Sequence, residues 1–232
     1  NGKTSVALNF DEAQGFFLVF RHKINKLSSI VKKNFPSANE LMNLTGSWKV
    51  QFDSKWGGPS APVVFSTLED WTTRTENGIK YFSGTASYHK TFDATTAMTA
   101  ASPFAVYLDL GTVKHIARVI INNKDLGIVW TAPWRVKIPA GLLKSKGNQL
   151  VIEVTNVWAN RLIGDEQEPA DCEWLPGHMN SGSFLKEFPE WFLKKQPRPS
   201  KGRYCFTTWN YFTKDSPLIS SGLLGPLRIT KE

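Results

Sequence analysis

Cysteine and histidine are scarce in this sequence, and neither forms a metal-binding pattern. Two cysteines, Cys172 and Cys205, and four histidines occur among 232 residues, with no spacing typical of zinc ligands. In an exported protein the two thiols could pair, and that disulfide would stabilise the fold by about 3 to 4 kcal/mol in the chain-entropy model. Two separate buried thiols are the alternative, and the sequence leaves both open.

Long apolar runs are also missing. No stretch of about 18 apolar residues occurs, so the sequence predicts no membrane span. The first residues, Asn-Gly-Lys-Thr, have neither the charged start nor the apolar stretch of a signal peptide. We therefore expect the chain to be an excised piece of a longer protein.

Acidic residues are fewer than basic ones, which gives a net charge of +8. A basic chain raises the question of nucleic-acid binding, but the lysines and arginines are scattered and no nucleic-acid-binding motif is present. The densest basic clusters, at 32–33 and 194–203, lie in expected loops. A solvated surface with no nucleic-acid partner is the better interpretation, and a hydrophobic content of 41% excludes a disordered chain.

Short β-type segments separated by turn residues make up most of the sequence. The clearest unit, 107–138, contains expected strands at 107–110, 115–121 and 126–130. Further strands are expected at 48–52, 62–65, 80–92, 149–158, 204–209 and 223–229. This pattern predicts an all-β fold, an antiparallel β-sandwich that occupies residues 44–232.

Two regions do not fit a simple sandwich. Apolar runs at 5–10 and 16–21 predict a β-hairpin that, with a linker at 24–43, makes residues 1–43 a remnant of a preceding domain. Residues 159–202 form a long irregular insertion, in which 184–195 could be a short amphipathic helix. So long an insertion is usually functional or packed on a neighbour.

A residue pattern within the central unit resembles a known sugar-binding domain. Leu108-Asp109-Leu110-Gly111 is followed by Asn122, Leu126-Gly127, Trp130 and Pro133, which is similar to the sugar-binding β-sandwich of glycoside hydrolase family 2. The segments 81–88, 160–167 and 222–226 are similar to the C-terminal region of α-L-rhamnosidase-like enzymes of family 106. The resemblance covers roughly 44–229.

The resemblance implies a galactose-binding-like jelly roll from an exported, polysaccharide-degrading enzyme. We expect a non-catalytic accessory domain, either carbohydrate-binding or structural, whose partners are a glycan or the catalytic domain of the parent protein. Its location would be periplasmic or extracellular. An autonomous carbohydrate-binding module is the alternative, and a complete glycoside hydrolase is a weaker third.

Aromatic side chains are the first candidates for sugar contact, because their flat faces cover the C–H patches of a sugar ring. The sequence has nine tryptophans, and for any one of them we expect a place in the core in about three cases of four. The least secure core positions are Trp130, Trp134 and Trp209, which lie at strand ends or beside polar loops.

Polar candidates follow the clearest strand. Asn160, Arg161, Asp165 and Glu166 could bind a glycan or another domain, although an Arg161–Asp165 ion pair that only fixes the loop is a somewhat better interpretation. Asp165 and Glu166 are a poor glycosidase pair, because adjacent extended residues point in opposite directions.

No cofactor is expected, with one exception. Sandwich domains of this kind often carry a structural calcium ion, and Asp109, Asp125 and Asp165 offer oxygen ligands at turns. The sequence thus allows a calcium site without fixing its place.

Overall fold

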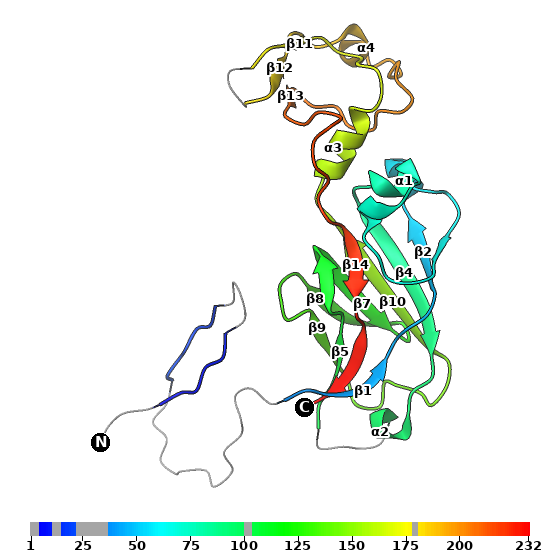
Figure 1. Ribbon diagram of the computed structural model, residues 1–232, viewed down its shortest axis with the longest axis vertical. Coiled ribbons are helices and arrows are strands. Elements are labelled where there is room, and N and C mark those ends of the chain that lie inside the picture. The colour runs from blue at the N-terminus through cyan, green and yellow to red at the C-terminus, as the bar shows by residue number, and fades with distance from the viewer. Residues whose placement is uncertain (1–4, 11–14, 22–36, 100–103, 178–180) are drawn as a thin grey trace.

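The computed structural model of the protein describes residues 5–10, 15–21, 37–99, 104–177 and 181–232 (Figure 1). Its strands are β1 (Asn39–Asn43), β2 (Trp48–Phe52), β3 (Val63–Phe65), β4 (Thr85–Phe92), β5 (Val106–Asp109), β6 (Thr112–Lys114), β7 (Ile116–Ile121), β8 (Lys124–Val129), β9 (Arg135–Ile138), β10 (Asn148–Thr155), β11 (Trp174–Leu175), β12 (Ser183–Leu185), β13 (Trp209–Asn210), β14 (Gly222–Gly225) and β15 (Arg228–Lys231). Its helical segments are η1 (Ser54–Trp56), η2 (Trp71–Thr73), α1 (Asn77–Lys80), α2 (Thr96–Thr99), α3 (Ala159–Asp165) and α4 (Glu190–Leu193).

Two antiparallel sheets make up the main body. One has the strand order β3-β2-β4-β10-β7-β8 and the other the order β1-β15-β5-β9, with β14 and β6 forming a two-stranded ribbon beside them (Figure 1). The apolar faces of the sheets are buried against each other. The predicted all-β class and antiparallel sandwich are confirmed.

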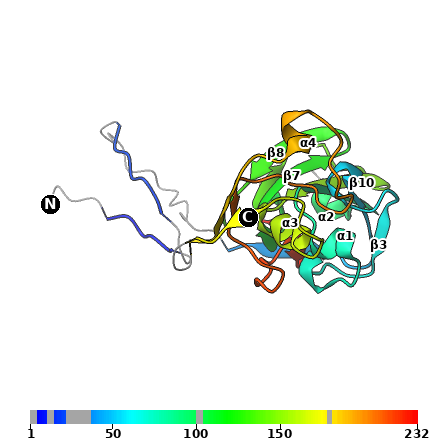
Figure 2. The same ribbon diagram turned by 90° about the horizontal axis from the view of Figure 1, so that it is seen from above.

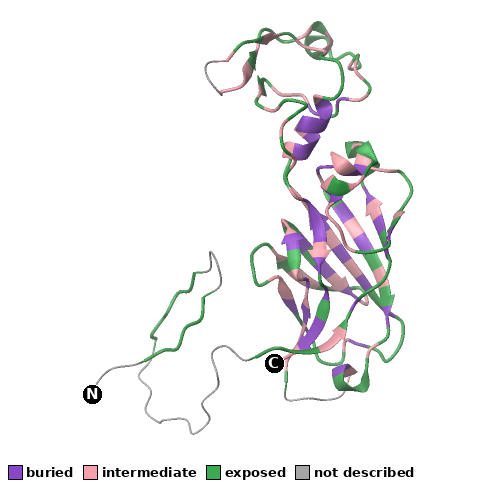
Figure 3. Cartoon of the chain, in the orientation of Figure 1, coloured by how far each residue is buried: buried purple, intermediate pink, exposed green. Residues whose placement is uncertain are grey.

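Strand β10 lies at the centre of the larger sheet. It pairs with β4 on one side and β7 on the other. Leu150, Ile152 and Val154 are buried, while the residues between them are only partly covered. Figure 3 shows buried and partly buried residues alternating along strands of the sandwich. This is the alternation that the sequence predicted for the strand, and it follows from the two-residue period of β structure.

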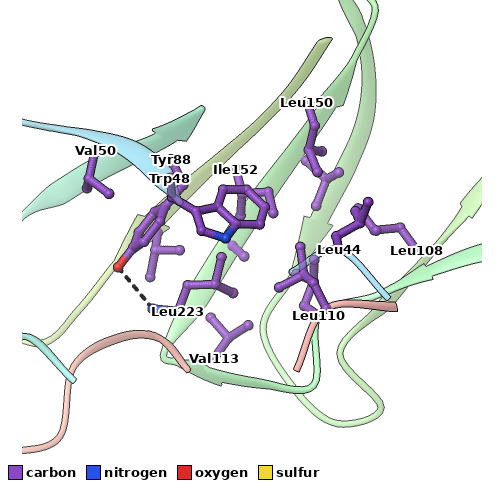
Figure 4. Close-up of a cluster of buried hydrophobic side chains, with 14 of the residues drawn as sticks. Leu44, Trp48, Val50, Tyr88, Leu108, Leu110, Val113, Leu150, Ile152 and Leu223 are labelled. Atoms are coloured by element: carbon purple, nitrogen blue, oxygen red, sulfur yellow. Dashed lines mark hydrogen bonds between the residues drawn. The ribbon is translucent and has the colours of Figure 1, made fainter. Parts of the chain in front are cut away.

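Buried hydrogen bonds stabilise the core in addition to apolar packing. The Tyr88 hydroxyl accepts hydrogen bonds from Trp71 Nε1 at 2.5 Å and from the backbone N–H of Leu223 at 3.2 Å (Figure 4). Because these contacts join β4, η2 and β14, they fix the closing ribbon to the large sheet. Burial raises the pKa of Tyr88, so its hydroxyl keeps its proton.

Four expected strands are wrong in part, and the one expected at 149–158 ends at Thr155. The strand expected at 80–92 begins at Thr85, since α1 precedes it and Gly84 has a φ of 143°. The strand expected at 204–209 is reduced to β13, because the N–H groups of Tyr204 and Cys205 donate to the Asp165 carboxylate instead of to a neighbouring strand. The strand expected at 223–229 is interrupted by Pro226, which lacks an N–H, and its halves join different sheets.

The N-terminal region also differs from the expectation. Residues 5–10 and 15–21 form no strand. The two segments meet at Phe10 and Phe16, whose rings pack edge to face with their centroids 5.1 Å apart. The expected linker up to residue 36 lies outside the described residues. Its end forms β1, which pairs with β15, so the small sheet extends beyond the expected boundary at residue 44.

The expected insertion is a small structured unit. We call residues 166–177 and 181–212 the distal lobe; it contains the sheet β11-β12-β13 and α4, and α3 connects it to the sandwich (Figure 1). Figure 2 shows α3 and α4 from above. The helix expected at 184–195 is wrong in part, since Ser183–Leu185 is strand β12 and only the single turn α4 after Pro189 is helical. No helix in the described ranges is both long and apolar enough to cross a bilayer.

Candidate functional site

Helix α3 carries a buried ion pair at the base of the distal lobe. Arg161 Nε donates to Asp165 Oδ1 at 3.0 Å, and both side chains are almost completely buried. The same carboxylate accepts the backbone N–H groups of Tyr204 and Cys205, the latter at 2.7 Å. The Arg161 guanidinium also lies over the Tyr204 ring, 4.9 Å from its centroid. The ion pair that the sequence offered as an alternative is confirmed, and it is buried.

Two more arginines bind carboxylates in the distal lobe. Arg203 donates to Glu166 Oε1 at 2.8 Å and to the carbonyl oxygens of Pro169 and Glu168. Arg198 donates to Asp171 Oδ2 at 2.5 Å and to the carbonyl oxygen of Cys205 at 2.7 Å.

The charge state of Asp171 follows from these contacts. Burial alone would raise the pKa of Asp171, but its hydrogen bonds and ion pair with Arg198 outweigh burial and hold the pKa below its usual value. This carboxyl group is therefore ionised at neutral pH.

The three carboxylates surround a small cavity. It has a volume of about 60 Å³ and is bordered by Asp165, Glu166, Asp171, Arg198 and Arg203, with aromatic residues on the side of β13. Ligand pockets usually measure about 300 to 1,000 Å³. A cavity of this size holds a few water molecules and is too small for a sugar ring.

The two cysteines border the same cavity, and both are free thiols. Cys172 Sγ donates to Asp171 Oδ1, and Cys205 Sγ accepts from Trp158 Nε1 at 2.9 Å. Burial raises the pKa of each thiol to about 11. The separate thiols that the sequence left open are what the structure shows, and both are protonated at neutral pH.

Asn160 is fully buried and fixes the chain where it leaves the distal lobe. Its amide exchanges two hydrogen bonds with the backbone of Ile219, at 2.7 and 2.8 Å, and donates a third to Ser221 Oγ. All its hydrogen-bonding groups are thus directed into the protein, and its local role is structural.

A second hollow opens on the surface where the sandwich meets α3. It is a groove of about 290 Å³ lined by Trp56, Ser83, Gly84, Asn156 and Trp158. Trp56 is 43% exposed and Trp158 is 60% exposed, although large aromatic side chains are usually covered. We call it the Trp56–Trp158 groove.

Gly84 and the side-chain amide of Asn156 shape the groove. Gly84 has a positive φ, and a Cβ there would lie 3.1 Å from the Phe82 ring and 3.7 Å from Trp56 Cδ1. Asn156 accepts the Gly84 N–H through Oδ1 and donates to the Phe82 carbonyl oxygen and to Ser221 Oγ. The floor of the groove is therefore formed by main chain without a side chain at Gly84, which Asn156 fixes where β4 begins and β10 ends.

The loops on either side orient the two indole rings. Trp56 ends η1, which Asp53 caps and which Gly57 terminates with a φ of 82°. A Cβ on Gly57 would collide with the Tyr204 ring at 2.7 Å, so glycine permits close packing there. The hydrogen bond to Cys205 holds the Trp158 ring.

The seven expected binding residues do not form one site. Trp130 is 71% exposed and Trp134 is packed against the core, on either side of the loop between β8 and β9. Asn160, Arg161 and Asp165 are buried in α3, and Glu166 is bound to Arg203. Trp209 is half-exposed, and its indole donates to the Ser181 carbonyl oxygen at 2.5 Å.

The expectation for the tryptophans is also wrong as a whole. Of nine, only Trp48 and Trp71 are fully buried, because most of the others lie at strand ends or in the distal lobe. Sequence reasoning missed Trp56 and Trp158. One signal was present, since Trp56 stands directly before Gly57-Gly58-Pro59, and Trp158 is the last residue of the strand expected at 149–158, beyond the end of β10 at Thr155.

The candidate calcium ligands are not brought together. Asp109 accepts the N–H of Gly111, Asp125 binds Arg118 and the N–H of Gly127, and Asp165 binds Arg161. Among the described residues no group of three or more His, Cys, Asp or Glu is placed to hold a metal ion. These aspartates do not fit a calcium site in this arrangement.

Comparison with known proteins links the chain to much larger ones. No family model matches it. It is 38% identical over 232 residues to a "Putative beta-glucuronidase" of Formosa agariphila, and the match covers 98% of this chain but 19% of that protein. The chain thus spans about a fifth of this curated relative.

Solved structures give a similar result. A rhamnosidase from Novosphingobium sp. PP1Y superposes on 87% of this chain with a TM-score of 0.66 and 32% identity, and the match covers 16% of the rhamnosidase. A weaker likeness, with a TM-score of 0.41 and 20% identity, covers 50% of this chain and 21% of a β-glucuronidase from Ruminococcus gnavus. The chain matches a small part of proteins that are named as glycoside hydrolases.

Proposed function

We propose that this chain is a non-catalytic accessory domain of a larger, exported glycoside hydrolase that degrades polysaccharide. One observation carries the proposal: almost the whole chain aligns with a small fraction of a β-glucuronidase-like protein and of a rhamnosidase. The parent enzyme would be α-L-rhamnosidase-like, as the resemblance to family 106 implies. Its catalytic domain would lie in the remaining part of the polypeptide.

The chemistry of the acidic residues supports a non-catalytic role. A glycosidase needs two carboxyl groups about 5 to 9.5 Å apart, one of them with a raised pKa so that it can donate a proton. In the cavity of the distal lobe each carboxylate is bound to its own arginine, and the pKa of Asp171 is lowered. A carboxyl group with a lowered pKa, such as Asp171, is a poor proton donor.

The accessory role would be to support the catalytic domain and to contact the glycan. The sandwich has a continuous apolar core, and one end of it carries two exposed indole rings beside a groove. This end, rather than the loop with Trp130 and Trp134, is the better place for sugar contact, because its two indoles border a single hollow.

An autonomous carbohydrate-binding module is the second candidate. The observation in its favour is that the chain itself supplies a groove lined by two exposed tryptophans. In that case the chain would bind glycan without the rest of the polypeptide.

An activity assay tests the non-catalytic proposal. The purified chain is incubated with aryl rhamnosides and aryl glucuronides, alongside Glu166→Gln and Asp171→Asn variants. We expect no release of the aryl group above the blank for any of the three proteins. Turnover by the chain that either substitution abolishes would overturn the proposal.

A further inference from the structure

We infer that the Trp56–Trp158 groove binds an uncharged sugar ring of a polysaccharide by stacking its C–H face on the indoles. The inference rests on the proposed function and adds to it the place of contact and the class of sugar. It moves the expected contact away from Trp130 and Trp134, and it excludes uronic acids as the preferred ligand.

The first step concerns the rings themselves. Two partly exposed tryptophans border a single groove of about 290 Å³. An exposed indole forgoes much of the stabilisation that burial of a large aromatic side chain provides, about 1.5 to 3 kcal/mol. Aromatic faces that remain uncovered in pairs are typical of binding surfaces, where they find a partner that is apolar on one side and polar on its edge.

The second step is that the groove is pre-organised. Trp158 Nε1 is held by Cys205 Sγ, and Trp56 is fixed by the cap of Asp53 and the left-handed Gly57. A ring that is already oriented loses little entropy when a ligand stacks on it. The groove therefore needs no rearrangement to receive a sugar.

The third step concerns charge. None of the five lining residues is ionisable as a side chain except at extreme pH, although the chain as a whole has a net charge of +8. Lys55 directly precedes Trp56 but does not line the groove, and Arg161, three residues after Trp158, is buried and bound to Asp165. A uronate carboxylate inside the groove would lose water without meeting a cation in the lining, which disfavours its binding relative to a neutral sugar.

The fourth step concerns the floor. Asn156 Oδ1 accepts one hydrogen bond, from Gly84, and a carbonyl oxygen can accept two. Ser83 Oγ, which accepts the N–H of Arg161, also lines the groove. Hydroxyl groups at the edge of a sugar ring can use these atoms, whereas an aliphatic segment of a neighbouring domain would leave them unused.

A glycan array with variants tests the inference. The probes are neutral oligosaccharides built from rhamnose, galactose, xylose or glucose, and oligosaccharides that contain galacturonate or glucuronate. The proteins are the wild type, Trp56→Ala, Trp158→Ala, and the control Trp130→Ala, which removes an exposed indole elsewhere. Thermal unfolding of each variant shows whether it is folded, and Trp56→Ala lies outside α3, so it leaves the base of the distal lobe intact.

We expect binding to neutral probes that falls about tenfold or more in Trp56→Ala and Trp158→Ala and by less than twofold in Trp130→Ala. Binding that is confined to uronate probes would overturn the charge argument. Binding that survives Trp56→Ala but is lost in Trp130→Ala would overturn the site and leave the proposed accessory role standing.

Two further outcomes would also contradict the inference. If no probe binds at all, the groove is not a glycan site and the carbohydrate-binding form of the proposed function fails with it. If Trp56→Ala instead weakens association with the catalytic part of the parent polypeptide, the occupant is protein.

Discussion

The sandwich and the distal lobe are stabilised by different forces. In the sandwich, strands with alternating apolar residues bury side chains such as Phe52, Tyr88 and Ile152 completely between two sheets. In the distal lobe and at its base in α3, three arginine–carboxylate pairs hold short segments together, and many aromatic side chains of the lobe remain half-exposed. The difference teaches that a structured insertion can be fixed by polar contacts on a separately stable core, and that such a unit can open on its own.

The largest expected effect is in the sandwich core. Phe52 packs against Phe65, Trp71 and Phe82, with ring centroids 5.0 to 6.2 Å apart. Phe52→Ala should lower the free energy of unfolding by about 3 to 5 kcal/mol, because it removes a large buried side chain and leaves a cavity. Urea unfolding followed by circular dichroism measures it. The control is Val64→Ala, which shortens an exposed side chain on the neighbouring strand β3. A loss of less than 1 kcal/mol in Phe52→Ala would contradict this description of the core.

Removal of the buried carboxylate should come next. Asp165→Ala leaves Arg161 buried without its partner and frees the N–H groups of Tyr204 and Cys205, which should destabilise the distal lobe locally by about 3 kcal/mol. Trypsin should then cleave faster at Lys194, Lys195 and Lys201 while a sandwich fragment persists.

The matched control for this experiment is Asp125→Ala, which removes an exposed aspartate that also binds an arginine and a backbone N–H. Its cleavage pattern should equal that of the wild type. If Asp165→Ala instead unfolds the sandwich together with the lobe, the two regions are a single cooperative unit.

Acid should act on the distal lobe through Asp171. Its pKa is lowered in the folded protein because the contacts with Arg198 outweigh burial. The stabilisation is therefore complete above the unfolded pKa, about 3.9, and is lost as the pH falls through the lower folded pKa. Hydrogen exchange of residues 166–177 and 181–212, corrected for the intrinsic rate, should increase between pH 5 and pH 2. In Asp171→Asn this part of the pH dependence should disappear, and an unchanged profile would count against the Asp171–Arg198 contact.

The smallest effect should come from the exposed pair on α4. Lys194 Nζ lies 2.8 Å from Glu190 Oε2, but both side chains are largely exposed, so water competes with the contact. Lys194→Ala should leave thermal unfolding unchanged within error. A clear destabilisation would mean that surface charges, as well as buried ones, hold the lobe.

The sequence predicted the sandwich because its signals are local. In β10 the alternation of Leu150, Ile152 and Val154 with more polar residues defines both the strand and its buried face. The strands expected at 115–121 and 126–130 correspond to β7 and β8 for the same reason, and Asn122 and Asn123 between them adopt positive φ, as asparagine does readily in hairpin turns.

The distal lobe and the groove could not be predicted in this way, because they depend on contacts between distant residues. The residue types at Tyr204 and Cys205 favour a strand, but their N–H groups donate to the Asp165 carboxylate, which lies far away in the sequence. The seven residues of α3 show no apolar periodicity that would predict a helix. Trp56 and Trp158 come from different loops that only the folded sheet brings to one groove. Trp130, by contrast, looked promising from its loop position and stands alone on the surface.

A titration followed by nuclear magnetic resonance tests the central claim most directly. The indole N–H signals of the tryptophans are assigned by single substitutions, and the neutral oligosaccharide that binds best on the array is added. The account predicts that the signals of Trp56 and Trp158 shift with a common saturation curve while those of Trp130 and Trp209 stay in place. Shifts confined to Trp130 or Trp209 would contradict it.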